Sequence, residues 1–491
     1  MNRSIFYKNI KPFLAIAVIS IILCSCEGDL EQEVFDRLAA STFFKTKDDA
    51  LSAVTASYRG MMPIWNISNY ETTAQSSMST DELICSWGWD GWKRLNDINL
   101  TEDFSGDVLS YPYLRLMPAI SQVTIYIDKI SPIEMDETLK KRLTAELIGL
   151  RAIYGHQLYN LYGPLNIVTD PVAATDPNTP FLPRPTAAEM VAVIENDYKT
   201  AAAGLPVKFT GDDYGRISKA ACWTGLMQLY MHDKRWQDAI TAGREIQGMG
   251  YSLVANYDDN FTLKSKGGNS EIILSICTRP DANSNAWLAM SLTSAYKDPS
   301  GQSLMAWGGY KMPWKTYDKF DQKDKRLFRL LAVFPSQPNG AMFDARANGY
   351  IGALPMKYGP DPAAVGASHG VDIPVYRYAD VLLMLAEAIN EVDGPTAEAY
   401  NLVNTVRTRA GLENLPTGLS KDEFRNKLMD ERLFELWCEG TRRNDLIRWG
   451  TYIQRAKDEG SIYAKPEYVL YPIPRTAVTE SGGIVKQNPG Y

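Results

Sequence analysis

Histidine is scarce in this sequence. It occurs three times in 491 residues, at His156, His232 and His369. Few side chains are therefore available for a catalytic triad or a metal site that uses imidazole. The motifs of zinc peptidases (H-E-x-x-H), serine hydrolases (G-x-S-x-G), P-loop proteins (G-x-x-x-x-G-K-S/T) and dinucleotide-binding folds (G-x-G-x-x-G after a strand) are also missing. We therefore expect no catalytic residue, no metal ligand and no cofactor.

Basic runs, paired cysteines and internal linkers are lacking as well. Acidic residues outnumber basic ones by 58 to 51, and the sequence has no basic cluster that could bind the phosphates of a nucleic acid. Both observations argue against a nucleic-acid partner. Four cysteines stand singly, without a C-x-x-C, so we expect buried free thiols rather than zinc or a disulfide framework. They are Cys85, Cys222, Cys277 and Cys438.

Long apolar runs are confined to the start of the chain. Arg3, Lys8 and Lys11 precede a largely apolar run from Phe13 to Leu23, which is the pattern of a signal peptide over residues 1–25. As a helix this run spans only about 17 Å, well short of the ~30 Å hydrocarbon core, so a permanent membrane helix is disfavoured.

The end of this leader, Leu23-Cys24-Ser25-Cys26, resembles the bacterial lipobox. In that motif a signal peptidase cuts ahead of a cysteine that becomes acylated. The resemblance implies that Cys26 is the first mature residue and carries acyl chains such as palmitate, which hold a domain on a bilayer without a spanning helix. An ordinary secretory signal with incidental cysteines is the alternative.

Acidic residues follow Cys26 directly. Four of the seven residues from 27 to 33 are acidic, which resembles the surface-export signal of lipoproteins in the Bacteroidetes. We expect residues 26–40 to form a flexible tether. Loss of the three basic residues of the leader leaves 48 basic against 58 acidic residues, so the formal net charge falls from −7 to −10. The sequence thus predicts a lipid-anchored protein of the outer membrane that faces the cell exterior.

Helical periodicity dominates the rest of the chain and predicts a mainly α-helical fold. Trp223, Leu226, Tyr230 and, sixteen positions after Trp223, Ala239 match the tetratricopeptide pattern W-x2-L-x3-Y…A, in which alanine permits close helix packing. A weaker repeat of this spacing consists of Val381, Met384, Ala388 and Ala397. Such helix pairs stack into a scaffold. The predicted helical segments are 47–62, 137–162, 218–248, 376–410 and 420–438.

Long stretches without helical periodicity interrupt this scaffold. We expect them to be large, irregular loop insertions, where ligand sites tend to lie. The insertions are 63–112, 163–186, 251–316 and 331–375. We expect residues 41–491 to form a single domain, helical and tetratricopeptide-rich over about 41–250 and loop-rich over about 251–491.

The C-terminal third carries the most specific motifs. Residues 376–388 resemble an R-x-A-D-V-L-L-M-x-A-E-A helix, and residues 431–450 follow the pattern E-R…E-L…E-G…R…D-L-x-R-W-G. Residues 471–474 (Y-P-I-P) and 487–491 (Q-N-P-G-Y) match two closing motifs. On these segments the chain resembles the SusD/RagB family of outer-membrane nutrient-binding lipoproteins.

The resemblance implies a SusD-like fold, no catalysis, and capture of a nutrient ligand. It also implies a complex with a TonB-dependent transporter of the SusC type, over which the lipoprotein acts as a lid. Glu431, Glu435 and Glu439 lie on one helix face, and we expect a buried charge network rather than a pair of catalytic acids. The expected partners are Arg432, Arg442, Arg443, Asp445 and Arg448.

Tryptophans outside the helical pattern are the candidate ligand contacts. A sugar-binding surface needs flat aromatic rings for the C–H faces and polar side chains for the hydroxyls. We predict that Trp87, Trp89 and Trp92, in a glycine-bearing loop, and Trp287 and Trp307, in a second irregular stretch, contact a glycan. Hydrogen bonds are expected from Asp81, Asp90 and Arg94. Because tryptophan is mostly buried, a core position is the alternative for each ring.

Three other functions stay open at this point. In the first, the ligand is a peptide or another non-sugar nutrient, as the RagB branch of the family name suggests. In the second, the chain is a carboxylate-based glycoside hydrolase, since two catalytic acids leave no spacing signature in a sequence. In the third it is a purely structural part of a transporter complex.

Overall fold

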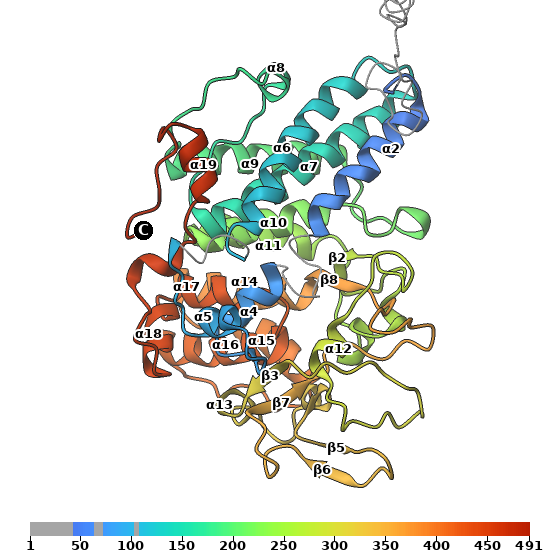
Figure 1. Ribbon diagram of the computed structural model, residues 1–491, viewed down its shortest axis with the longest axis vertical. Helices are drawn as coiled ribbons and strands as arrows, with labels where there is room; N and C mark the ends of the chain where they lie inside the picture. The colour runs from blue at the N-terminus through green and yellow to red at the C-terminus, as the bar shows by residue number, and fades with distance from the viewer. Residues whose placement is uncertain (1–42, 63–71, 103–107) are drawn as a thin grey trace, which may run out of the picture. The chain divides into compact units, whose positions relative to one another are not determined.

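The structure is a computed structural model that describes residues 43–62, 72–102 and 108–491. Thr46–Tyr491 form one compact unit, in which most regular elements are helices (Figure 1). None of the described helices combines the length and the apolar character needed to cross a membrane.

The N-terminal predictions cannot be placed in this structure. The signal peptide predicted over 1–25, the acylated Cys26 and the tether predicted over 26–40 all lie outside the described residues. They stay predictions from the sequence.

The mainly α-helical fold is confirmed, and each of the five predicted segments is helical. The helices of eleven or more residues are α2 (Lys47–Ser57), α6 (Tyr111–Ile130), α7 (Glu137–Tyr162), α9 (Ala187–Gly204), α10 (Lys219–His232), α11 (Trp236–Gln247), α14 (Tyr378–Asp393), α15 (Ala397–Arg409) and α16 (Lys421–Leu436). The shorter ones are α4 (Thr72–Met78), α5 (Asp90–Asn96), α8 (Pro171–Thr175), α12 (Trp287–Ser291), α13 (Trp314–Tyr317), α17 (Arg442–Arg448), α18 (Tyr452–Asp458) and α19 (Arg475–Glu480).

Successive long helices pack against one another and form the scaffold. α6 contacts α7, α7 contacts α9, α9 contacts α10, α10 contacts α11, and α11 contacts α14, which also packs on α15 and α16 (Figure 1). Side chains that accept hydrogen bonds from the first turn fix the helix starts: Asp136 caps α7, Thr186 caps α9 and Ser218 caps α10. Local capping and long-range packing therefore agree on the same boundaries.

The first predicted tetratricopeptide pair corresponds to α10 and α11. Leu226 and Ala239 are fully buried and Tyr230 nearly so, whereas Trp223 is only half-buried. A Cβ added to Gly243 of α11 would lie 2.9 Å from the Met227 methyl carbon of α10. Small residues on α11 thus allow the two helices to approach closely, as the pattern predicts.

The second predicted pair corresponds to α14 and α15. Val381 and Ala388 are fully buried and Met384 is 2% exposed. The prediction for Ala397 is wrong, because this residue is the first of α15 and is exposed. Ala399, two positions on, is the small residue of α15 that is fully buried.

Short antiparallel strands occupy the loop-rich part. Four form a sheet in the order β1 (Ile84–Cys85), β3 (Tyr310–Pro313), β7 (Gly352–Pro355) and β4 (Leu330–Leu331). Two further pairs are β2 (Ile272–Ile276) with β8 (Ile373–Arg377), and β5 (Val333–Pro335) with β6 (Met342–Asp344). In the first sheet Cys85 pairs with Tyr310, so a segment near the start of the unit is joined to one more than 200 residues later.

The first predicted insertion, 63–112, contains regular structure. Its helices α4 and α5, drawn in blue, lie among C-terminal helices drawn in orange, and α4 contacts α17 (Figure 1). This placement brings the loop with Trp87, Trp89 and Trp92 into the C-terminal half of the unit.

The four predicted thiols are all free, but they are not all buried. Cys222 and Cys438 are in the core, Cys85 is half-buried and Cys277 is exposed. The prediction of buried thiols is therefore wrong for Cys277, which lies just after β2 where the chain returns to the surface.

Candidate functional site

Three tryptophans of the first cluster lie at the start of α5. Trp89 is the N-cap residue of α5 and is 40% exposed, whereas Trp92, one turn later, is 4% exposed. Their ring centres are 4.9 Å apart in an edge-to-face arrangement, and that of Trp87 lies 6.4 Å from that of Trp92. A Cβ at Gly91 would overlap the Trp89 ring, so glycine is needed there for the ring to lie over the first turn. Buried Trp92 thus supports two rings that reach the surface.

The second cluster joins the first through the backbone. The indole N–H of Trp87 donates to the main-chain carbonyl of Trp307 at 3.1 Å. The half-buried Trp87 ring rests on Gly309, where an added Cβ would lie 2.7 Å from it. Trp307 itself is 43% exposed. These contacts bring the segments that carry Trp87, Trp89 and Trp307 together, and we call the three rings the tryptophan platform.

Main-chain hydrogen bonds fix the segment that carries Trp307. Its amide donates to the carbonyl of Ala289 on α12 at 2.6 Å, and Gly308 has the positive φ of +73° that suits glycine. On the other side, the Ser86 amide donates to the Gly309 carbonyl at 2.8 Å. The turn that carries the exposed Trp307 ring is thus hydrogen-bonded to α12 on one side and to the Ser86 segment on the other.

A polar hollow adjoins the platform. It has a volume of about 460 Å³ and is lined by the residues directly before Trp307 and by the segment after α12. The two sides meet at Gly308, where an added Cβ would lie 3.7 Å from Thr293. The polar side chains in its lining include Thr293, Ser294, Gln302, Ser303 and Gln337. Hydroxyl and amide groups beside exposed indoles are the combination that suits a sugar, and the sequence analysis did not single out these residues.

Trp287 lies in the core. It is fully buried, its indole N–H donates to the Pro355 carbonyl at 2.6 Å, and its ring centre is 5.1 Å from that of Tyr310. A fully buried ring has no face to offer a sugar, and the same holds for Trp92. Among the five predicted tryptophans, Trp87, Trp89 and Trp307 are the ones with exposed ring surface.

Asp81 forms a structural ion pair rather than part of the platform. Its two carboxylate oxygens each accept a hydrogen bond from the Arg442 guanidinium at 2.8 Å, and the pair is buried. Burial alone would raise the pKa of Asp81, but Arg442 outweighs burial and holds this pKa well below its usual range. The pair ties the segment after α4 to α17.

Asp90 and Arg94 lie in a different hollow. It has a volume of about 390 Å³, and its lining combines Asp90, Lys93, Arg94 and Asp97 of α5 with Tyr463. Arg94 donates to the hydroxyl of Thr101, which lies in the same hollow. The platform tryptophans do not belong to this lining, so the structure does not bring Asp90 and Arg94 to the predicted place.

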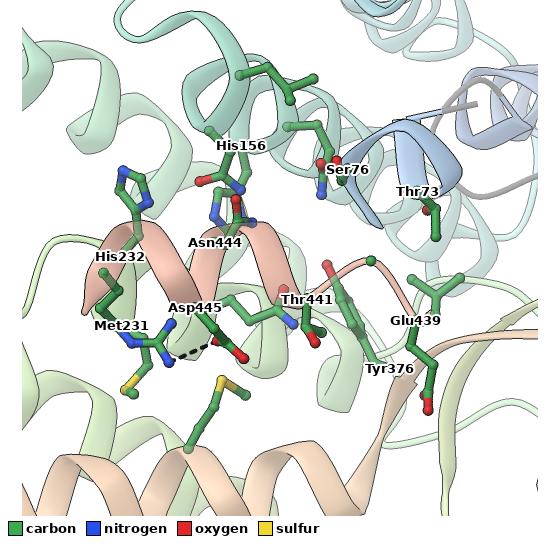
Figure 2. Close-up of a pocket in the computed structure, with 18 of the residues that line it drawn as sticks. Thr73, Ser76, His156, Met231, His232, Tyr376, Glu439, Thr441, Asn444 and Asp445 are labelled. Atoms are coloured by element: carbon green, nitrogen blue, oxygen red, sulfur yellow. Dashed lines mark hydrogen bonds and ion pairs between the residues drawn. The ribbon is translucent and has the colours of Figure 1, made fainter. Parts of the chain in front are cut away.

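An interior polar cavity of about 60 Å³ lies between α7, α10 and α17 (Figure 2). Figure 2 shows His156 and His232 on its wall, close to Asn444 and Asp445 of α17. Burial lowers the pKa of His156 to about 3 and that of His232 to about 4, so both imidazoles are neutral at pH 7. Asp445 accepts hydrogen bonds from Arg432 and Arg448. The cavity is part of the core that joins the helices.

The predicted charge network exists, but with other partners. The glutamates 431, 435 and 439 pair with Arg326, Arg377, Arg407, Arg409 and Lys357. Of the expected partners, Arg432 pairs with Asp380 and Asp445, Arg442 with Asp81, and Arg448 with Glu387 and Asp445. Arg443 donates to two main-chain carbonyls instead. The prediction of one helix face is wrong for Glu439, because α16 ends at Leu436. Burial raises the pKa of Glu435, but Arg409, Arg377 and Arg326 outweigh it and hold this pKa below its usual range. A carboxylate held ionised by three arginines is a poor general acid.

Metal ligands do not gather in the described part of the chain, where no group of three or more His, Cys, Asp or Glu side chains is placed to hold an ion.

Comparison with known proteins identifies relatives along the whole chain. Residues 358–491 match the model of the SusD family. SusD-like protein P25 of Formosa agariphila is 24% identical over 515 residues, which cover 94% of this chain and 95% of the relative. The starch-binding protein SusD of Bacteroides thetaiotaomicron is 23% identical over 571 residues, or 99% of both chains.

The fold has solved counterparts as well. A laminarin-binding SusD-like protein superposes with a TM-score of 0.76 at 22% identity, over 91% of this chain and 100% of its own. The C-terminal part thus matches the SusD family, the chain is similar to SusD-like proteins over nearly its full length, and its fold is that of a SusD-like protein.

Proposed function

We propose that this protein captures a glycan at the cell surface, on the tryptophan platform and the adjoining polar hollow. The observation that carries the proposal is the hydrogen bond from the Trp87 indole to the Trp307 carbonyl, which unites two tryptophan segments on one face. Trp89 and Trp307 are 40% and 43% exposed, although tryptophan side chains are mostly buried in proteins. Exposed indoles beside hydroxyl and amide groups match the C–H faces and hydroxyls of a sugar.

The names of relatives support a glycan over a peptide. One relative is named as starch-binding and one structural neighbour as laminarin-binding, and both align over nearly their full lengths. In the adjoining hollow the platform meets mostly neutral polar groups.

We propose that binding occurs without catalysis. Glycoside hydrolysis needs two carboxyl groups that face the same bond, one of them able to donate a proton. The carboxylates of the C-terminal motifs are buried and each is paired with arginine or lysine, as Glu431 and Glu435 are with Arg326. Such groups hold helices together.

We further propose that acylated Cys26 anchors the protein in the outer membrane, facing outward, and that it delivers glycan to a SusC-type TonB-dependent transporter. The support is the lipobox resemblance of residues 23–26, the acidic residues that follow, and the similarity to SusD-like proteins. No spanning helix is needed, because several acyl chains on one cysteine suffice.

Calorimetric titration of the purified protein with laminarin, starch and other neutral oligosaccharides tests the proposal. We expect saturable binding of at least one glycan, which Trp89→Ala and Trp307→Ala each weaken. Product analysis after long incubation should find the glycan unchanged. Binding that persists when both rings are removed would move the site elsewhere, and turnover that follows the protein through purification would make it an enzyme.

A further inference from the structure

Lys311 is a buried lysine directly beneath the tryptophan platform. It lies in β3, opposite Ile84 of β1, and is 3% exposed. Its ammonium donates to the carbonyl of Gly308 at 2.5 Å and to that of Tyr310 at 3.0 Å. No carboxylate among the described residues lies within ion-pair distance of Lys311, whereas the ammonium of Lys357, which is also deeply buried, pairs with Glu439 at 2.8 Å.

An ammonium without a counter-ion is costly in this position, although two carbonyls and the Tyr350 ring, whose centre is 6.0 Å from the nitrogen, offset part of the cost. Removing a cation from water without a counter-ion disfavours its charged form, and burial lowers the pKa of Lys311 to about 8. A methionine of similar length would fill the same space without that cost. Residues that reduce stability, such as a buried lysine, are typical of functional sites.

The two carbonyls that Lys311 binds both follow Trp307 in the chain, one at Gly308 directly after it and one at Tyr310. The Gly308 carbonyl also accepts from the Ser86 hydroxyl at 3.1 Å, and the neighbouring Trp307 carbonyl accepts the Trp87 indole N–H. Lys311 and Ser86 therefore hold the same carbonyl from two sides. Without the ammonium, the Gly308 carbonyl would keep only the bond from the Ser86 hydroxyl, and the turn that carries Trp307 would be held less firmly beside Trp87.

We propose that Lys311 is a positioning residue that locks the Trp307–Tyr310 turn and so makes Trp87 and Trp307 one rigid binding surface, at the expense of stability. The role of this lock in binding rests on the proposed glycan function, but the effect of Lys311 on the Trp307–Tyr310 turn is a property of the unliganded protein. A surface that is rigid before binding loses less conformational entropy when the ligand arrives.

The first test needs no ligand. In hydrogen exchange followed by mass spectrometry, Lys311→Met should speed exchange in a peptide over 304–312, by about tenfold if one hydrogen bond's worth of stabilisation is lost. Peptides from α10 and α11 should be unchanged. Lys297→Met is the matched control, because Lys297 also donates to a main-chain carbonyl, that of Pro338, but is partly exposed. Equal exchange in Lys311→Met and the wild type would overturn the lock.

The second test compares affinity with stability. Lys311→Met should bind glycan about tenfold more weakly, while its melting temperature stays equal or rises because the buried charge is gone. Lys311→Arg, which keeps the charge and the donors, should recover part of the affinity. A melting temperature that falls together with affinity would mark Lys311 as an ordinary structural residue and sink the proposal.

The pH profile adds a signature that a packing role lacks. Cys85 on β1 and Tyr350 ahead of β7 are titratable groups near Lys311. Of the helices that contact β3, α12 has no titratable group and α13 carries Lys315 and Tyr317. Burial raises the pKa of Cys85, so this thiol stays neutral at pH 8. Wild-type affinity should fall as the pH rises through about 8 and the ammonium loses its charge, and Lys311→Met should remove that step. If the wild type bound no glycan while exchange quickened in Lys311→Met, the lock would stand and the proposed function would fail.

Discussion

Trp87 and Trp307 are 220 positions apart in the chain, and the indole N–H of one donates to the main-chain carbonyl of the other at 3.1 Å. The bond lies beside the pairing of Cys85 with Tyr310, so a two-residue strand is enough to bring the two tryptophan segments together. Trp307 and Trp89 both keep part of their ring surface in solvent. The platform is therefore assembled by tertiary structure and not by either loop alone.

Removal of the exposed ring of Trp307 should cost affinity and leave the fold intact. Trp307→Ala removes one aromatic face and is expected to weaken glycan binding about tenfold or more, measured by calorimetry. Because the ring is 43% exposed, the melting temperature should change by no more than about 2 °C. Phe181→Ala is the matched control, since this exposed aromatic lies in the segment between α8 and α9. Equal affinity in the two variants would contradict the assignment of Trp307 to the site.

Trp287→Ala should behave in the opposite way. Its ring is fully buried and its N–H is bonded to the Pro355 carbonyl, so truncation leaves a large cavity and an unpaired carbonyl. We expect the free energy of unfolding in urea to fall by about 3–5 kcal/mol. Glycan affinity, measured well below the melting temperature, should change less than in Trp307→Ala. A stable Trp287→Ala protein that has lost binding would mean that this ring does reach the ligand.

The scaffold could be predicted because its signals are local. Helix α7 has the predicted bounds, since a strong apolar period, Asp136 at its N-terminus and Gly163 after it all act within a few residues. Helix α9 carries an equally local signal, because Thr186 and Glu189 form a capping box at its start. Helix α6 was harder to predict, because Pro118 lies in its interior, where proline ordinarily argues against a helix.

The type of site could be predicted from the sequence, but not which residues form it. Tryptophans outside helical periodicity did indicate a platform, but nothing local distinguishes exposed Trp307 from buried Trp287. Their difference arises from packing against β3 and β7, whose strands are too short to leave a period of two in the sequence. Asp81 was misassigned for a similar reason, because its partner Arg442 lies 361 positions away.

The two buried histidines should make the fold sensitive to moderate acid. His156 is 1% exposed, and burial lowers its pKa from 6.5 to about 3. In the unfolded chain the imidazole takes up a proton below about pH 6.5, whereas the folded protein does not until about pH 3. The unfolded state then binds more protons, so the free energy of unfolding falls as the pH drops through this window.

Urea unfolding at a series of pH values between 6.5 and 4 measures this effect. His156→Gln, which is neutral throughout, should reduce the slope by about 1.4 kcal/mol per pH unit relative to the wild type. Gln is also able to bond Tyr198, whose hydroxyl lies 3.3 Å from Nδ1 of His156. An unchanged slope would mean that this imidazole is already protonated in the fold.

Cys26→Ala tests the anchor separately from the ligand site. If Cys26 is the acylated residue, its loss removes the acyl chains that hold the protein, and each buried methylene of such a chain contributes about 0.8 kcal/mol to membrane attachment. The variant should leave the membrane fraction while its glycan affinity and melting temperature stay at the wild-type values, because the platform residues lie far along the chain from Cys26. Fractionation must be repeated in a strain without the partner transporter, since a protein docked on a membrane barrel would sediment with it even when unlipidated. If Cys26→Ala remained on the membrane in that strain, another attachment would have to exist and the lipobox assignment would be wrong.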